Sequence, residues 1–87
     1  MNLENNVGTA PVVLTRDLSV EDCGRLRLIA EDCACTVSLL YNGRAAGTDR
    51  LRGLMNLGIV AGSTVFLKVH GSPAVAEALS RAVAALR

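Results

Sequence analysis

The sequence is poor in aromatic residues and in histidine. It has no tryptophan and only one tyrosine, one phenylalanine and one histidine among 87 residues. With so few aromatic side chains, the core must be aliphatic and densely packed from Val, Leu, Ile, Ala and Cys. A chain of this length buries only about 60–65% of its unfolded surface, so it builds one core and forms one domain.

Strong charge of either sign is also lacking, and so are long apolar runs. Nine basic and eight acidic residues leave a formal net charge of +1, with no cluster of Lys and Arg that would favour nucleic acid. No apolar run approaches the roughly 18 residues of a membrane span. Residues 1–10 lack the basic and apolar regions of a signal peptide. We therefore expect a cytoplasmic protein that binds neither nucleic acid nor membrane.

The three cysteines do not form a metal-binding pattern. Cys23, Cys33 and Cys35 are spaced C-x9-C-x-C, and no second Cys or His pair completes a zinc site. We expect no metal and no cofactor. The odd number fits small buried side chains in a reducing compartment.

The first half of the chain predicts a strand followed by a helix. Residues 1–9 are polar, without periodicity, and are expected to be a flexible lead-in. The β-branched run at residues 11–16 predicts a strand with its proline at the start. Ser19 is a typical helix cap, and Asp22 three residues later is able to reach back to the cap amide. The helix should begin at Val20 and bury Val20, Cys23, Leu26 and Ala30.

The second half alternates strands with short helices. Residues 35–41 have a period of two, and Asn42-Gly43 predicts a type I′ turn to an edge strand at residues 44–47. A short helix at residues 51–57 is closed by Gly58. Residues 64–69 predict another strand. From Ser72-Pro73 a last helix should run to the C-terminus and bury Val75, Leu79, Ala82, Val83 and Leu86.

The order strand-helix-strand-strand-helix-strand-helix predicts an α+β domain with its helices on one face of a single sheet. Together with YNGR at residues 41–44 and LRGLMNLGIVAGSTVFLKV at residues 51–69, this order resembles HPr, the histidine-containing phosphocarrier of the bacterial sugar phosphotransferase system. The resemblance covers roughly residues 10–86 and places an HPr-like domain at residues 10–87. It implies an open-faced sandwich, with four antiparallel strands in the order first, fourth, second, third.

The family's phosphoacceptor motif is degenerate in this sequence. In HPr a histidine within G-[IL]-H-[AT]-R-P-A, at the start of the first helix, takes a phosphoryl group from enzyme I. A gap-free alignment puts Ser19 at the histidine position, Glu21 at the arginine and Asp22 at the proline. A phosphoryl group about 4 Å from either carboxylate meets a repulsion of about 1–4 kcal/mol per unit-charge pair. We therefore expect the charge of this site to be reversed.

Ser19 has two interpretations. As a helix cap it contributes about 1 kcal/mol; as an atypical phosphoryl acceptor it would form an ester, a poor donor, with no nearby base. The only histidine, His70, should lie roughly 15–20 Å away, at the end of the fourth strand. Where some relatives carry a regulatory serine, this chain has Arg50.

Two surfaces are candidates for binding. The positions through which HPr proteins meet their partners are here Gly24, Leu28, Leu51, Arg52 and Met55, although Leu51 and Met55 could instead pack under their helix. Alternation puts Val13, Leu40 and Phe66 on the open sheet face, as a homodimer interface or under the N-terminal segment.

The resulting hypothesis is a non-catalytic HPr-like protein that has lost the phosphoacceptor histidine. It would act as a regulatory or scaffolding module that binds proteins, including phosphotransferase-system proteins. The alternatives are a phosphocarrier that uses Ser19 and a structural subunit that exists only as an oligomer through its sheet face.

Overall fold

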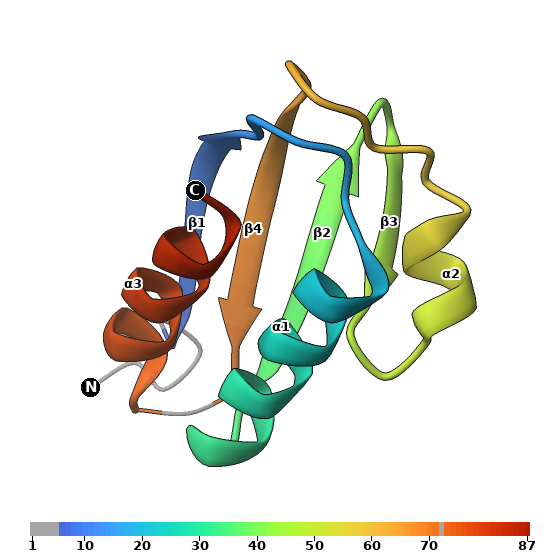
Figure 1. Ribbon diagram of the computed structural model, residues 1–87. Helices are drawn as coiled ribbons and strands as arrows, with labels where there is room; N and C mark the ends of the chain where they lie inside the picture. The colour runs from blue at the N-terminus through green and yellow to red at the C-terminus, as the bar shows by residue number, and fades with distance from the viewer. Residues whose placement is uncertain (1–5, 72) are drawn as a thin grey trace.

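In the computed structural model, residues 6–71 and 73–87 are described, and within them a four-stranded antiparallel sheet carries its helices on one face (Figure 1). The elements confirm the predicted order and the α+β class. Their bounds are β1 (Val7–Val13), α1 (Val20–Asp32), β2 (Thr36–Tyr41), β3 (Arg44–Gly47), α2 (Leu51–Met55), β4 (Thr64–His70) and α3 (Val75–Leu86). Helices α1 and α3 lie side by side over the sheet, and α2 lies beside β3 at the sheet edge.

The sheet order is β1-β4-β2-β3, as the resemblance implied. Alternation in β4 is confirmed, because Val65, Leu67 and Val69 are fully buried while Phe66 and Lys68 face outward. The core between sheet and helices is aliphatic throughout. Its largest fully buried apolar side chains are Leu14, Leu26, Leu39, Leu54, Leu67, Leu86, Val37, Val65 and Val69.

Strand β1 begins earlier and ends earlier than predicted. It pairs with β4 from Val7 opposite His70 to Val13 opposite Thr64. Residues 7–9, expected in the lead-in, are drawn into the sheet by this antiparallel ladder, while residues 1–5 lie outside the described part. Pro11 is in mid-strand, opposite Phe66, and is tolerated because β1 is an edge strand.

The hairpin between β2 and β3 is confirmed. Asn42 and Gly43 have φ values of 54° and 78°, the positive angles that a type I′ turn requires at both central positions. The return strand β3 has the predicted bounds and forms the second edge of the sheet.

The helices differ from the predictions at particular residues. In α1, Val20 is exposed rather than buried, whereas Asp22 is fully buried. Helix α3 begins at Val75 after Ala74, so the predicted start at Pro73 is wrong, and Ser72 lies outside the described residues. None of the helices in the described residues is long and apolar enough to cross a lipid bilayer.

Candidate functional site

The N-terminus of α1 is closed by its own side chains. Ser19 has extended backbone angles (φ −104°, ψ 166°), and its Oγ accepts a hydrogen bond from the Asp22 backbone N at 3.1 Å. The carboxylate reaches back, because Asp22 Oδ2 accepts from the Ser19 backbone N at 3.0 Å. This reciprocal capping box confirms the helix-cap interpretation of both residues.

The Asp22 carboxylate has two guanidinium partners that the sequence pattern did not indicate. Its Oδ1 accepts from Arg16 Nη2 at 2.6 Å and from Arg25 Nη1 at 2.9 Å; the Asp22 side chain is fully buried, whereas those of Arg16 and Arg25 are 44% and 54% exposed. Burial alone would raise the pKa of Asp22. The hydrogen bonds from Arg16 and Ser19 outweigh burial and hold the pKa below its ordinary value of 3.8.

Arg16 joins the start of α1 to the end of α3. Its Nη1 donates to the Arg87 carbonyl oxygen and its Nη2 to the Ala85 carbonyl oxygen, both at 3.3 Å. The last carbonyls of a helix lack partners within the helix and lie at the negative end of its dipole. One guanidinium group therefore satisfies both the C-terminus of α3 and the buried carboxylate of α1.

Of the two carboxylates that led us to expect a reversed charge at this site, that of Asp22 is balanced by Arg16 and Arg25. Glu21 is exposed and makes no ion pair with any described residue. The positive end of the α1 dipole already faces an anion, Asp22. The arrangement is therefore an anion site that is filled by the protein itself.

His70 and Arg50 both lie away from this cluster. His70 ends β4 and pairs opposite Val7 of β1 and Thr36 of β2. The seven residues of β4 span about 20 Å, and the cluster follows the opposite end of β1. Arg50 occupies the N-cap position of α2 and makes no side-chain capping hydrogen bond.

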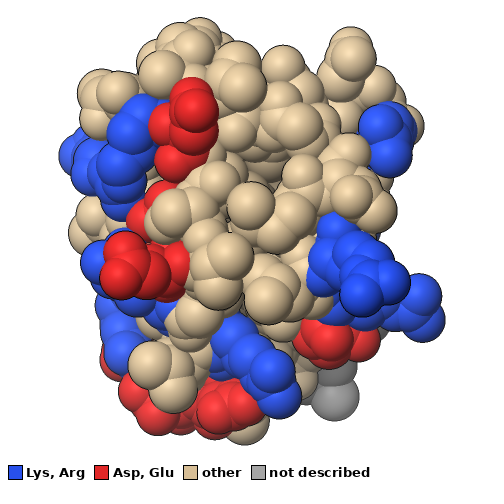
Figure 2. All heavy atoms as spheres, turned by 45° about the vertical axis from the view of Figure 1, so that its right-hand side comes forward, with Lys and Arg blue, Asp and Glu red and all other residues tan. Residues whose placement is uncertain are grey.

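A shallow groove between α1 and α2 contains part of the predicted partner surface. It encloses about 110 Å³ and is lined by Val20, Cys23, Gly24, Arg27, Thr48 and Leu51. Met55 lies beside it, with its Sδ 3.9 Å from Cys23 Sγ. Leu51 is 46% exposed and Met55 38%, so neither is packed under its helix. Figure 2 shows a broad uncharged area on this side of the molecule, bordered both by Lys and Arg and by Asp and Glu side chains.

Leu28 does not share this groove. It is exposed in a separate depression between α1 and α3, together with Arg25 and Arg81. A step of four residues turns a helix by about 40° beyond a full turn, which directs Leu28 away from α2 relative to Gly24. Of the residues predicted for a partner surface, Gly24 and Leu51 line the groove together with Val20, Met55 lies beside it, and Leu28 lies elsewhere.

Comparisons with known proteins decide the architecture. The sequence matches no protein-family profile and no curated protein. Among solved structures, the phosphocarrier protein HPr from Bacillus anthracis str. Ames matches with a TM-score of 0.79 at 21% identity, covering 95% of this chain and 100% of that one. The chain has the HPr fold.

Two further solved structures of HPr proteins also match the fold of this chain. HPr-C-His from Thermoanaerobacter tengcongensis matches with a TM-score of 0.66 at 16% identity, covering 90% of each chain. A histidine-containing phosphocarrier protein, from work on the divergence of Mycoplasma from Gram-positive bacteria, matches at 0.68 and 14% identity, covering 92% of this chain and 96% of that one.

The open face of this HPr-fold sheet carries an apolar row across all four strands. Phe66 pairs directly with Pro11 on one side and Leu40 on the other, and Leu40 pairs with Ala45. Val13 lies two residues along β1 from Pro11. Val13, Leu40 and Phe66 are all exposed. The homodimer through this face stays a prediction.

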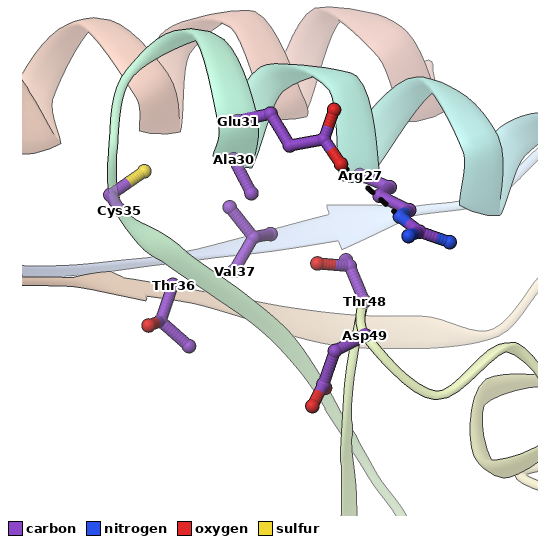
Figure 3. A pocket seen from close by; sticks show the side chains of 8 residues that line it. All are labelled: Arg27, Ala30, Glu31, Cys35, Thr36, Val37, Thr48 and Asp49. Atoms are coloured by element: carbon purple, nitrogen blue, oxygen red, sulfur yellow. Dashed lines mark hydrogen bonds and ion pairs between the residues drawn. The ribbon is translucent and has the colours of Figure 1, made fainter.

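A larger hollow lies where the C-terminal half of α1, the start of β2 and the connection from β3 to α2 meet (Figure 3). It measures about 330 Å³ and is lined by Arg27, Ala30, Glu31, Cys35, Thr36, Val37, Thr48 and Asp49. Arg27 and Thr48 also line the α1/α2 groove, so the two hollows are neighbours. Sequence spacing did not indicate this cavity because its residues come from three separate segments.

Proposed function

We propose that this chain is a protein-binding module on the HPr fold, regulatory or scaffolding in role, that carries no phosphoryl group. The observation that carries the proposal is the buried Asp22 carboxylate with Arg16 and Arg25. In the gap-free alignment with the phosphoacceptor motif, Ser19 takes the histidine position. The only histidine, His70, ends the strand β4.

The geometry around Ser19 opposes phosphoryl transfer. Its Oγ accepts from the Asp22 amide, and the Asp22 carboxylate lies at the same helix terminus. A phosphoryl group on Ser19 would face that carboxylate at close range, at about 1–4 kcal/mol of repulsion per unit-charge pair near 4 Å. The two arginines that could offset the phosphate are already bound to Asp22.

The groove between α1 and α2 is the proposed docking surface. Val20, Leu51 and Met55 are apolar side chains exposed to solvent around a small hollow, and Arg52 is exposed beside them. Apolar anchors flanked by arginine are typical of protein interfaces. The likeness to HPr phosphocarriers makes phosphotransferase-system proteins the first partners to test.

A phosphocarrier that uses Ser19 is the second candidate. The likeness to phosphocarrier structures and the place of Ser19 at a helix N-terminus favour it. Under this alternative, enzyme I and phosphoenolpyruvate phosphorylate the wild type, and Ser19→Ala abolishes the modification.

Titration of the full chain against purified phosphotransferase-system proteins, with binding measured by calorimetry, tests the docking surface. Leu51→Glu should weaken binding by at least about tenfold, since an apolar anchor is replaced by a charge. The matched control is Leu28→Glu, which places the same charge on the α3 side of α1 and should leave affinity within about twofold. Equal loss in both variants would contradict the assignment, as would binding that neither variant changes.

A further inference from the structure

The open face of the sheet carries a lysine on one side of its strand β2. Figure 1 shows the helices α1 and α3 on the opposite face. On the open face, Lys68 of β4 pairs with Ser38 of β2, and Ser38 pairs in turn with Gly47 of β3. Lys68 is exposed and forms no ion pair with any described residue. Its charge is therefore available to a partner on this face.

The carboxylate of Asp49 lies on the other side of β2, over the same face. Ala46 packs against the core, and side chains alternate along a strand, so a Cβ on Gly47 would point to the open face. That Cβ would lie 2.6 Å from Asp49 Oδ1, so the carboxylate covers the glycine. Figure 3 shows the Asp49 side chain directed away from the hollow below α1. Like Lys68, Asp49 is exposed and has no ionic partner in the part of the chain that the structure describes.

The next row of the open face has the same arrangement in apolar side chains. Leu40 of β2 pairs with Phe66 of β4 on one side and with Ala45 of β3 on the other. Phe66 is 49% exposed and Leu40 36%. Neighbouring strands lie about 4.8 Å apart, so the large ring and the small methyl group are equally far from β2. In both rows, positions related by a half turn about β2 are complementary in charge or in size.

We propose that the open face binds a second copy of this chain, face to face, about a two-fold axis that runs along β2 in the plane of the interface. This axis exchanges positions on β4 with positions on β3. Lys68 of each copy then meets Asp49 of the other, and Phe66 of each copy covers Ala45 of the other. Leu40 meets its own counterpart on the axis. Two sheets pack in this way about 10 Å apart, with their strands aligned to within about 30°.

A second copy fits this face better than an unrelated apolar surface does. An apolar surface would take Lys68 and Asp49 out of water without giving either charge a partner, which is costly. A two-fold contact supplies the opposite charge to both, and it does so twice in each dimer. The proposal does not rest on the docking groove, which is formed by helices on the other side of the sheet.

The size of the face indicates a weak, reversible dimer. Three strand spacings give a width of about 14 Å, and a seven-residue strand spans about 20 Å, so the flat area is roughly 300 Å². A standard interface buries about 800 Å² on each partner. We therefore expect a dissociation constant on the order of 100 µM.

Sedimentation of the full chain between about 10 µM and 1 mM tests the proposal. The apparent mass of the wild type should rise with concentration. Lys68→Glu and Asp49→Lys each place two like-charged pairs in the dimer, so each should weaken self-association at least about tenfold. Glu21→Lys is the matched control, because it reverses an exposed carboxylate on α1, and it should leave the dissociation constant within about twofold.

A mixture of the two weakened variants shows whether the charges meet between copies. In a dimer of Lys68→Glu with Asp49→Lys, the two reversed charges attract each other and the two unchanged charges attract each other. The mixture should therefore recover the association of the wild type, which misfolded variants could not do. Lys68→Glu mixed with Glu21→Lys should stay weaker, since one like-charged pair remains.

Three results would overturn the proposal. The first is a wild type that stays monomeric at about 1 mM. The second is equal association of the wild type, Lys68→Glu and Asp49→Lys. The third is a mixture of these two variants that associates no more than each does alone. Association that appears only after deletion of residues 1–5 would also overturn it, because the face would then belong to that segment.

Discussion

Replacing Asp22 with asparagine should destabilise the fold strongly for a single isosteric change. The carboxylate accepts hydrogen bonds from Arg16, Arg25 and the Ser19 amide while fully buried. A hydrogen bond to a charged group is worth about 1.5–3 kcal/mol, reduced here because both guanidinium groups are half exposed to water. We expect Asp22→Asn to lower the free energy of unfolding by about 2 kcal/mol, and Tm by roughly 8–16 °C for a domain of this size.

The pH dependence of this loss distinguishes the charge of Asp22 from its shape. Because folding lowers the pKa of Asp22 below 3.8, the carboxylate stabilises the fold above that pH, and the contribution is lost as pH falls through the lowered pKa. Urea unfolding of the wild type and Asp22→Asn should therefore differ fully near about pH 7 and by progressively less as the pH falls below 3.8.

Glu21→Gln is the control for this experiment, because Glu21 lies in the same helical turn and forms no ion pair with a residue that the structure describes. It should change stability by less than about 0.5 kcal/mol. An Asp22→Asn variant as stable as the wild type at neutral pH would refute the reasoning. A loss that does not change with pH would show that shape and not charge is responsible.

Three further predictions concern the backbone and the sheet face. Gly43→Ala should lower the free energy of unfolding by about 1 kcal/mol in urea titrations, because φ is 78° while the new Cβ meets no atom within 4 Å. At Gly24, in the middle of a helix, a new Cβ also meets no atom within 4 Å, so Gly24→Ala should raise the free energy of unfolding by about 0.5–1 kcal/mol. If both substitutions changed the free energy of unfolding in the same direction, the backbone argument would be contradicted. If the sheet face pairs two copies, the apparent mass of the wild type in sedimentation should rise with concentration, and Phe66→Glu should abolish that rise. A wild type that stays monomeric at every concentration would contradict a homodimer through the sheet face.

Local sequence signals predicted the parts of the fold that depend on a few neighbouring residues. The Ser19 and Asp22 capping box spans four residues, and the turn at Asn42-Gly43 requires positive φ at both positions; both are confirmed. The start of β1 at Val7 could not be predicted in this way. It is fixed by pairing with β4, which lies more than fifty residues later in the chain.

Sequence analysis could predict only the members of the candidate site that lie close together along the chain, Ser19 and Asp22. Nothing in the spacing links Arg16 to Asp22 or to the end of α3, because that cluster forms only when the loop after β1 and the C-terminus of α3 come together. The same holds for Thr48, whose burial results from the connection between β3 and α2 lying against α1 and β2. Polar residues buried by tertiary contacts carry no periodic signal.

Mass spectrometry after incubation with enzyme I, phosphoenolpyruvate and magnesium tests the central claim most directly, with an ordinary HPr as the positive control. The account predicts that the control gains one phosphoryl group, about 80 Da, while this chain gains none. A stoichiometric adduct that maps to Ser19 or His70 would contradict it, and would show that the domain carries phosphate despite the carboxylate of Asp22.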